Sequence, residues 1–178
     1  ATQVPVNTEH YDRSFASMAR TALRMDPDIV VLGETRDEDT AAVMVRAAIT
    51  DHLVFTTVHA NTAPEIITRL ADLGVSRSLL ASPNLLVTLV CQRLAPQLCQ
   101  ECAQPAVDAQ QCKPHINRWK LTFGDKVNEL KARGNRACSA GDSTGIAGRL
   151  AVAEVIWVDE KGLEFIKNDD MTGYFHYL

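Results

Sequence analysis

The chain has 178 residues, of which 46% are hydrophobic and 22% are charged, a composition typical of globular proteins. Its 18 Lys and Arg residues against 22 Asp and Glu residues give a formal net charge of -4, with no run of basic residues. This charge argues against a protein that binds nucleic acid through the phosphate backbone. No apolar stretch approaches the ~18 residues that a membrane-spanning helix needs, so we expect no such helix.

The first predicted elements alternate between helix and strand. Apolar residues recur at helical spacing over residues 14–25, and residues 29–32 form a short apolar run typical of a buried strand. A second helix is predicted over residues 40–50 and a second strand over residues 53–58. A strand, a helix and a strand in this order are typical of one parallel βαβ unit, so we predict an α/β fold.

The next segment is predicted to be helical. Residues 62–65 have the pattern of a capping box, a Thr followed three residues later by a Glu, and Gly74 is a typical C-terminal cap. Another helix is predicted from Ser76, broken near Pro83 and resumed over residues 84–94. Cys91 would lie within that apolar helix, where a core role is expected.

Beyond Pro96 the composition changes, and we expect a separate small subdomain there. Cysteines and prolines interrupt a polar segment, a helix is predicted over residues 116–132, and a strand over residues 150–156. The predicted division is residues 1–95, an α/β domain; residues 96–141, a small cysteine-bearing helical subdomain; and residues 142–178, a C-terminal strand and helical tail.

Two candidate reactive side chains follow the two predicted strands. Glu34 comes shortly after the first strand and His59 directly after the second. Carboxyl ends of parallel strands share one edge of a sheet, where ligands usually bind. A carboxylate there can orient a water molecule or hold magnesium, and an imidazole can sense a phosphate. The alternative is structural: Glu34 pairs with Arg36, and His59 caps a loop.

The sequence contains no phosphate-binding loop of the G-x-x-x-x-G-K-[ST] type, because none of its 9 glycines is followed by Lys. A nucleotide site on this chain would therefore lack the main phosphate cradle. We expect that cradle to lie elsewhere in a longer protein.

Several segments together resemble the secretion ATPase superfamily, the motors of type II secretion, type IV pili and type IV conjugation systems. The residues that carry the resemblance are LRMDPDIVVLGETRD (23–37), LVFTTVHAN (53–61), QRL with LCQEC (92–102), and TGIAGR (144–149) with Glu154. The match covers roughly residues 3–156. It implies the C-terminal part of a RecA-like P-loop NTPase, with the Walker A loop upstream.

The resemblance also implies roles for three residues. Glu34 corresponds to the catalytic glutamate of the Walker B element, and Gly33 to the glycine that this family has at the cofactor-binding position where other ATPases have Asp. His59 corresponds to the histidine of the family's His box, which couples the γ-phosphate state to domain movement. Thr35 departs from the family, which prefers an aliphatic residue at this position.

The function that the resemblance implies is ATP hydrolysis with Mg²⁺ that powers pilus assembly, type II secretion or conjugative transfer. The expected assembly is a homohexamer docked on an inner-membrane platform protein, cytoplasmic in a bacterium and peripheral to the membrane through its partners only. We expect the 178-residue chain to be inactive by itself. The alternative is a non-catalytic oligomerisation or adaptor module of a secretion machine.

The cysteines suggest a zinc site, because thiolates two residues apart can bind one ion. Cys99 and Cys102 have this spacing. Family members often carry a second Cys-x-x-Cys, but here only Cys138 of that pair is present, so Cys112 or His115 would complete the site. The alternative is a degenerate site without metal. A metal-dependent hydrolase is a weaker hypothesis; it would use four residues: Glu34, Asp37, His52 and His59.

Overall fold

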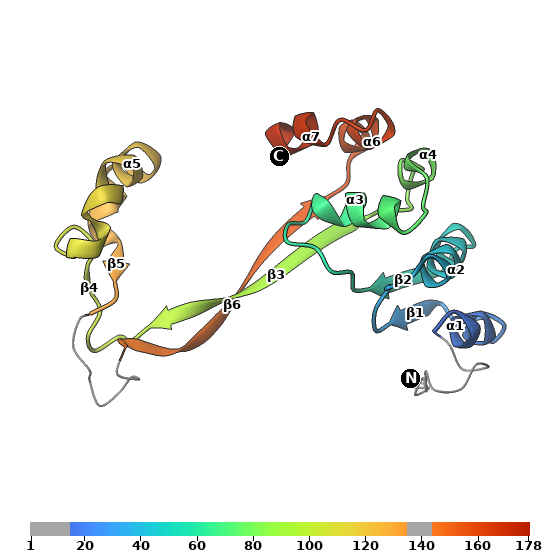
Figure 1. The fold of residues 1–178 in the computed structure, drawn as a ribbon, viewed down its shortest axis with the longest axis horizontal. Coiled ribbons are helices and arrows are strands. Elements are labelled where there is room, and N and C mark those ends of the chain that lie inside the picture. The colour runs from blue at the N-terminus through green and yellow to red at the C-terminus, as the bar shows by residue number, and fades with distance from the viewer. Residues whose placement is uncertain (1–14, 135–143) are drawn as a thin grey trace. The chain divides into compact units, whose positions relative to one another are not determined.

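The computed structural model describes residues 15–134 and 144–178, which form two compact units (Figure 1). The first unit combines the described residues up to Cys91 with Glu154–Leu178, and the second lies within Gln92–Ala153. The C-terminal helices therefore belong to the first unit. This division differs from the predicted boundaries at residues 96 and 142.

The first unit contains the predicted βαβ arrangement. Strands β1 (Ile29–Leu32) and β2 (Leu53–Thr56) are parallel neighbours, with Ile29 opposite Leu53 and Leu32 opposite Thr56. Helix α2 (Glu38–Ile49) connects them, and the Asp37 carboxylate caps it by accepting a hydrogen bond from the Thr40 amide at 2.8 Å. These elements confirm the α/β prediction.

Helices cover one face of this strand pair. Helix α1 (Phe15–Leu23) packs on α2, where Ala16, Ala19 and Val43 are buried together. The opposite face leaves Val31 and Phe55 exposed.

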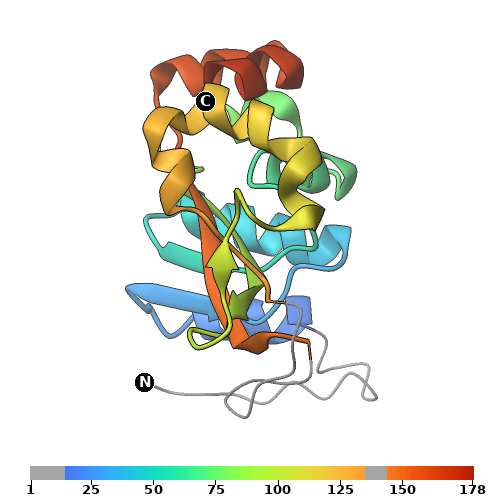
Figure 2. The same ribbon diagram turned by 90° about the vertical axis from the view of Figure 1, so that its left-hand side faces the viewer.

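The main hydrophobic core of the first unit contains residues from both stretches of sequence that form this unit. It includes α3 (Glu65–Asp72), α4 (Arg77–Leu80), α6 (Glu160–Lys167) and α7 (Met171–Tyr177). Helices α4 and α6 contact each other, as do α6 and α7 (Figures 1 and 2). The largest of its fully buried side chains are Ile67, Leu80, Ile166 and Tyr174.

The predicted helix over residues 84–94 is wrong. Residues Thr88–Leu98 form strand β3, which pairs with β6 (Ile146–Trp157) in a two-stranded sheet. Leu89 is buried between the exposed Thr88 and Val90, which is strand alternation rather than a helical stripe. The apolar residues at helical spacing misled the prediction because long-range pairing with β6 overrides local propensity.

The second unit has a small core of its own. Strands β4 (Gln104–Pro105) and β5 (Lys131–Ala132) form an antiparallel pair. The sequence between them forms three helices: the 3-10 helix η2 (Gln110–Cys112), α5 (Lys113–Phe123) and the 3-10 helix η3 (Gly124–Glu129). The predicted helix over 116–132 starts earlier, at Lys113, and gives way to a 3-10 helix at Gly124, whose φ of 55° favours glycine. The prediction is wrong at its C-terminal end, where residues 131 and 132 form strand β5. Within the described ranges, no helix has the length and apolar character needed to cross a membrane.

Candidate functional site

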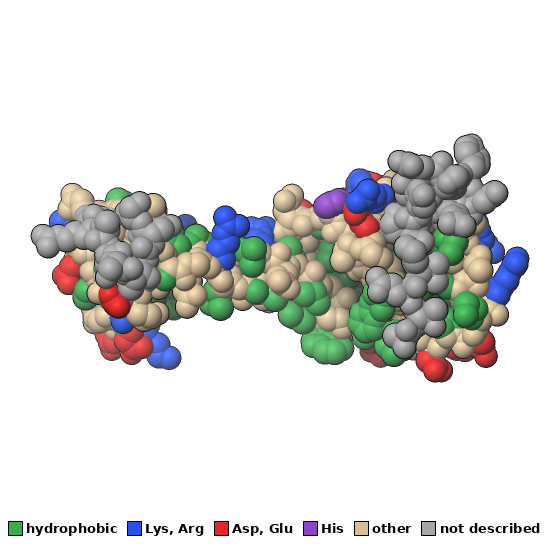
Figure 3. All heavy atoms as spheres, turned by 90° about the horizontal axis from the view of Figure 1, so that it is seen from below, with side chains coloured by type: hydrophobic (Ala, Val, Ile, Leu, Met, Phe, Trp, Pro, Cys, Tyr) green, Lys and Arg blue, Asp and Glu red, His purple; other side chains and the backbone are tan. Residues whose placement is uncertain are grey.

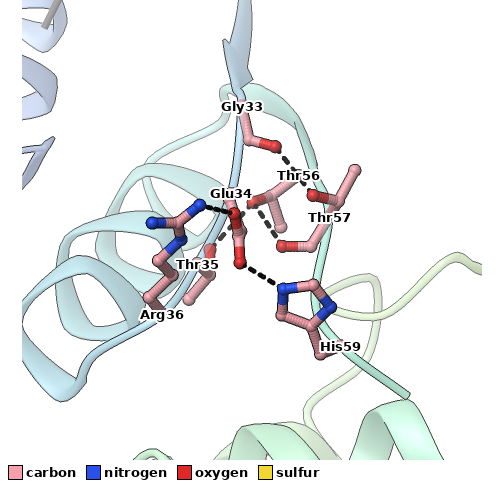
Figure 4. A network of polar contacts seen from close by, with 7 residues as sticks. All are labelled: Gly33, Glu34, Thr35, Arg36, Thr56, Thr57 and His59. Carbon is pink, nitrogen blue, oxygen red and sulfur yellow. Dashed lines mark hydrogen bonds and ion pairs between the residues drawn. The ribbon is translucent and has the colours of Figure 1, made fainter.

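The carboxylate of Glu34 lies just beyond β1 and contacts the His59 ring, which follows β2 (Figure 4). The His59 Nε2 is 2.7 Å from Glu34 Oε1. That oxygen is buried and has no other polar partner among the residues that the structure describes. The two candidate side chains therefore share one edge of the parallel pair, as the sequence predicts.

Arg36 contacts the other oxygen of the same carboxylate. Its guanidinium lies 2.5 Å from Glu34 Oε2, so Glu34 sits between an arginine and a histidine (Figure 4). The Glu34 side chain is only 16% exposed, whereas those of Arg36 and His59 are 68% and 86% exposed. Figure 3 shows a histidine beside acidic and basic side chains at the surface of the first unit.

Arg36 also lowers the pKa of the Glu34 carboxyl. The hydrogen bond and charge of Arg36, with a smaller contribution from His59, lower the pKa of the Glu34 carboxyl against the opposing effect of partial burial. In turn, Glu34 raises the pKa of Arg36. The lowered pKa makes this carboxylate a weaker base than it would be without Arg36.

Backbone and threonine contacts hold the Glu34 segment against the end of β2. The Thr35 amide donates to the Thr57 carbonyl at 2.9 Å, and the Thr57 hydroxyl donates to the Gly33 carbonyl at 2.7 Å. These two bonds lie on either side of Glu34 and extend the pairing of the strands past their ends. The backbone of Glu34 is thus held at the end of the strand pair, and its carboxylate is contacted by Arg36 and His59.

The departure at Thr35 has a structural reason. Its side chain is only 2% exposed, and its hydroxyl lies 2.8 Å from the Thr56 hydroxyl. A buried hydroxyl costs free energy unless it is hydrogen-bonded, and Thr56 provides that partner. The contact with Thr56 therefore accommodates the buried Thr35 hydroxyl.

Gly33 is not required by the packing that the structure describes. No described atom lies within 4 Å of the position that a Cβ would take at this residue. The space beside Gly33 and the buried oxygen of Glu34 fit a site for an oxygen-rich ligand with its cation. This observation fits the predicted cofactor-binding position but does not test it.

Two residues of the metal-hydrolase hypothesis have structural roles elsewhere. Asp37 caps α2, and the His52 Nδ1 lies 3.2 Å from the Ala47 carbonyl and from the Thr50 hydroxyl at the end of that helix. Within residues 15–134 and 144–178, no group of three or more His, Cys, Asp or Glu side chains is arranged to hold a metal. The geometry thus gives that hypothesis no support.

The predicted zinc ligands are only partly placed. Cys99 is buried at a turn in which the Ala103 amide donates to the Cys99 carbonyl at 2.9 Å. Cys112 is buried in the small apolar core of the second unit, and the His115 ring stacks on Trp119. Cys138 lies outside the described residues, so the set of Cys99, Cys102, Cys112 and Cys138 stays a prediction.

Sequence reasoning missed the part that Thr57 plays, whereas it named Arg36 as a possible partner of Glu34. The spacing of Glu34 and Arg36, with one residue between them, was a usable signal for a contact on one side of an extended segment. No local signal marks Thr57, because its bond to Gly33 depends on the pairing of two strands.

The comparison with protein families decides the relationship. The model of the family "Type II/IV secretion system protein" matches residues 1–176. The chain belongs to this family. The resemblance in the motifs is therefore confirmed.

Curated relatives match over most of this chain. Type II secretion system protein E of Aeromonas hydrophila is 36% identical over 92% of the chain and 31% of its own length. The type IV pilus assembly ATPase TfpB of Acinetobacter baylyi is 37% identical over 88% of the chain and 26% of its own length. The chain thus spans about a third or less of these relatives and matches their C-terminal part.

Solved structures confirm the fold class. The pilus retraction motor PilT with bound ADP matches with a TM-score of 0.60 and 25% identity, over 93% of this chain and 36% of that one. The ATPase DotB of Legionella pneumophila matches with a TM-score of 0.57 and 20% identity, which supports the fold alone. The chain has the α/β fold of the RecA-like secretion ATPases.

Proposed function

We propose that this chain is the C-terminal part of a motor that hydrolyses ATP to power type IV pilus assembly, type II secretion or conjugative transfer. The observation that carries the proposal is the contact between Glu34 and His59 at the carboxyl ends of two parallel strands. Ligands of open α/β sheets bind at this edge. The membership of the family and the names of its relatives point to the same activity.

In the proposed reaction, Glu34 orients a water molecule for attack on the terminal phosphorus and accepts its proton, while ADP leaves. Phosphoryl transfer depends mainly on positioning and charge stabilisation, which a fixed carboxylate can supply. His59, on the open side of Glu34, is placed to respond to the terminal phosphate. Gly33 and Glu34 would lie beside the bound nucleotide and Mg²⁺, whose charge neutralises the phosphates.

The pairing of Glu34 with Arg36 represents a resting arrangement in this proposal. A carboxylate with a lowered pKa is a weaker general base, so the base strengthens when Arg36 turns toward another anion. Arg36 is mostly exposed and can make that movement at little cost. Its new partner in the motor would be a phosphate or a neighbouring carboxylate.

The proposed assembly is a homohexamer that acts in the cytoplasm on an inner-membrane platform protein. The 178-residue chain by itself contains no phosphate-binding loop, so we expect weak ATP binding or none. A titration with Mg²⁺ and ATP, followed by calorimetry, checks this expectation. Tight binding that depends on magnesium would contradict it.

We also propose that the cysteine subdomain binds zinc. Cys99 and Cys102 would supply two thiolates from one turn. Metal analysis of protein purified without chelators tests it, with Cys102→Ser as the matched variant. We expect about one zinc per chain, lost in the variant; less than about a tenth of an equivalent in the wild type would remove the site.

The alternative function is an adaptor or oligomerisation module without catalysis. It predicts that Glu34→Gln leaves transport and ATP turnover of the full-length motor unchanged. The motor proposal predicts that both fall together. Steady-state hydrolysis, measured beside a transport or piliation assay, separates the two.

A further inference from the structure

The segment between β2 and α3 carries His59 and has no regular secondary structure. Besides the contacts of Thr57 and His59 described above, three hydrogen bonds hold residues 61–63 of this segment. The Asn61 amide donates to Glu65 Oε2 at 2.9 Å, the Cys91 thiol donates to the Asn61 carbonyl at 3.2 Å, and the Ala63 amide donates to Glu154 Oε2 at 2.7 Å. The position of His59 therefore depends on contacts outside its own segment.

The contact to Glu154 is the one that the segment depends on most. Ala63 is fully buried in the main core, so its amide cannot turn to water for a partner. A buried amide without an acceptor is costly, and Glu154 supplies a charged one. The amide also lies just before α3, where the helix dipole favours a negative charge.

The two longer-range contacts come from adjacent strands. Cys91 lies on β3 and Glu154 on β6, and these strands pair with each other. Cys91 and Glu154 both belong to the first unit, and both contact the same segment. Cys91 contacts it at Asn61, and Glu154 contacts it at Ala63. Glu154 also belongs to the sequence motif that begins with TGIAGR. The proposed site at Glu34 assigns no function to this motif.

We propose that Glu154 is a positioning residue that holds the His59 segment in place through the Ala63 amide. It makes no contact with the reacting groups. Glu154 holds the residue just before the start of α3. The four residues from His59 to Thr62 lie between that residue and the end of β2, so their position depends on this contact. The effect on turnover rests on the proposed ATPase function, whereas the effect on the segment does not.

The first test measures amide hydrogen exchange across residues 59–65 without nucleotide. Glu154→Ala removes the acceptor, Glu154→Gln keeps an amide oxygen that can accept, and Glu164→Ala on the exposed face of α6 is the matched control. We expect exchange of the Ala63 amide to accelerate about tenfold or more in Glu154→Ala. Glu154→Gln and the control should stay close to the wild type.

The second test measures steady-state ATP hydrolysis by the full-length motor. We expect Glu154→Ala to lower kcat on the order of tenfold with little change in KM, because a displaced His59 affects turnover more than ground-state binding. In a His59→Ala background, Glu154→Ala should cause almost no further loss. Glu154→Gln should restore most of the rate.

The outcomes separate this proposal from the proposed function. Unchanged exchange at Ala63 in Glu154→Ala would overturn the positioning role, whatever the rate of hydrolysis. A full additional loss in the His59→Ala background would also overturn it, since Glu154 would then act independently of His59. Accelerated exchange at Ala63 in Glu154→Ala, together with a wild-type motor that hydrolyses no ATP, would leave the positioning role standing and refute the proposed ATPase function.

Discussion

At the scale of single residues, Arg36 and His59 contact different oxygens of the Glu34 carboxylate. Arg36 is mostly exposed and contacts Oε2, whereas His59 contacts Oε1 from the segment that Glu154 anchors. Bonds from Thr57 to Gly33 and Thr35 hold the backbone on either side of Glu34. Replacing either partner is therefore expected to change the environment of this carboxylate.

Arg36→Gln tests the effect of Arg36 on the Glu34 pKa. In the wild type this pKa is lowered, so activity that needs the carboxylate falls only as the pH drops through the lowered value. Without Arg36 the pKa rises toward its ordinary value, and the acid limb of the kcat/KM profile moves to higher pH. The profile is measured on the full-length motor with Arg46→Gln as the control; coincident acid limbs for Arg36→Gln and the wild type would contradict the assignment.

The hydroxyls of Thr35 and Thr56 are expected to depend on each other. Thr35→Val leaves Thr56 without its partner and should lower the free energy of unfolding by about 1 kcal/mol. The double replacement with Val should cost less than the sum of the two single replacements, because no polar group then lacks a partner. Urea unfolding of the four proteins gives the coupling, and strict additivity would show that the contact contributes nothing.

Which of these residues the sequence predicts depends on how local their signal is. Glu34 and His59 were predictable because each follows an apolar run that ends at the same sheet edge. The effects of Thr57 and Glu154 were not, since their partners lie 24 and 91 residues away. Glu154 appeared in a motif, but the motif gave no reason for a contact with Ala63.

At the scale of elements, one carboxylate links the two C-terminal helices. Asp159 caps α6 by accepting from the Gly162 amide at 2.7 Å, and its other oxygen accepts from the Tyr177 hydroxyl of α7 at 2.6 Å. The Tyr177 bond, more than the cap, lowers the pKa of Asp159, and the same bond raises the pKa of Tyr177. One side chain thus links the start of α6 to the end of α7.

Asp159→Ala should reduce the free energy of unfolding, because α6 then loses the side chain that caps its first turn. Tyr177→Phe should cost less, because the cap of α6 remains. The stabilisation by Asp159 is present at neutral pH and is lost as the pH falls through its lowered pKa. Thermal melts near pH 7 and pH 3 measure both effects; equal stability of Asp159→Ala and the wild type at pH 7 would contradict the role.

Elements with a local signal were predicted and those made by distant pairing were not. The βαβ unit follows from apolar runs and the Asp37 cap, which act within a few residues. Strand β3 was predicted as a helix because its apolar residues match a helical period before β6 is considered. Helix α5 and η3 were predicted as one helix, and only the turn at Gly124 separates them.

At the scale of the whole molecule, the two units contain different candidate functional residues. The first contains Glu34, His59 and the anchor at Glu154, and the second contains Cys99, Cys102 and Cys112. The family relationship covers residues 1–176 and so includes both units. Catalysis in our account belongs to the first unit, within a longer motor whose other parts supply the phosphate cradle.

The most direct test of this account is steady-state ATP hydrolysis by the full-length motor, wild type beside Glu34→Gln, at equal hexamer content. Glu38→Gln, a nearby exposed glutamate in the first turn of α2, is the matched control. We predict that Glu34→Gln lowers kcat on the order of 10- to 1,000-fold while nucleotide binding persists, and that the control does not. Equal rates for Glu34→Gln and the wild type would contradict the assignment of Glu34 as the catalytic residue.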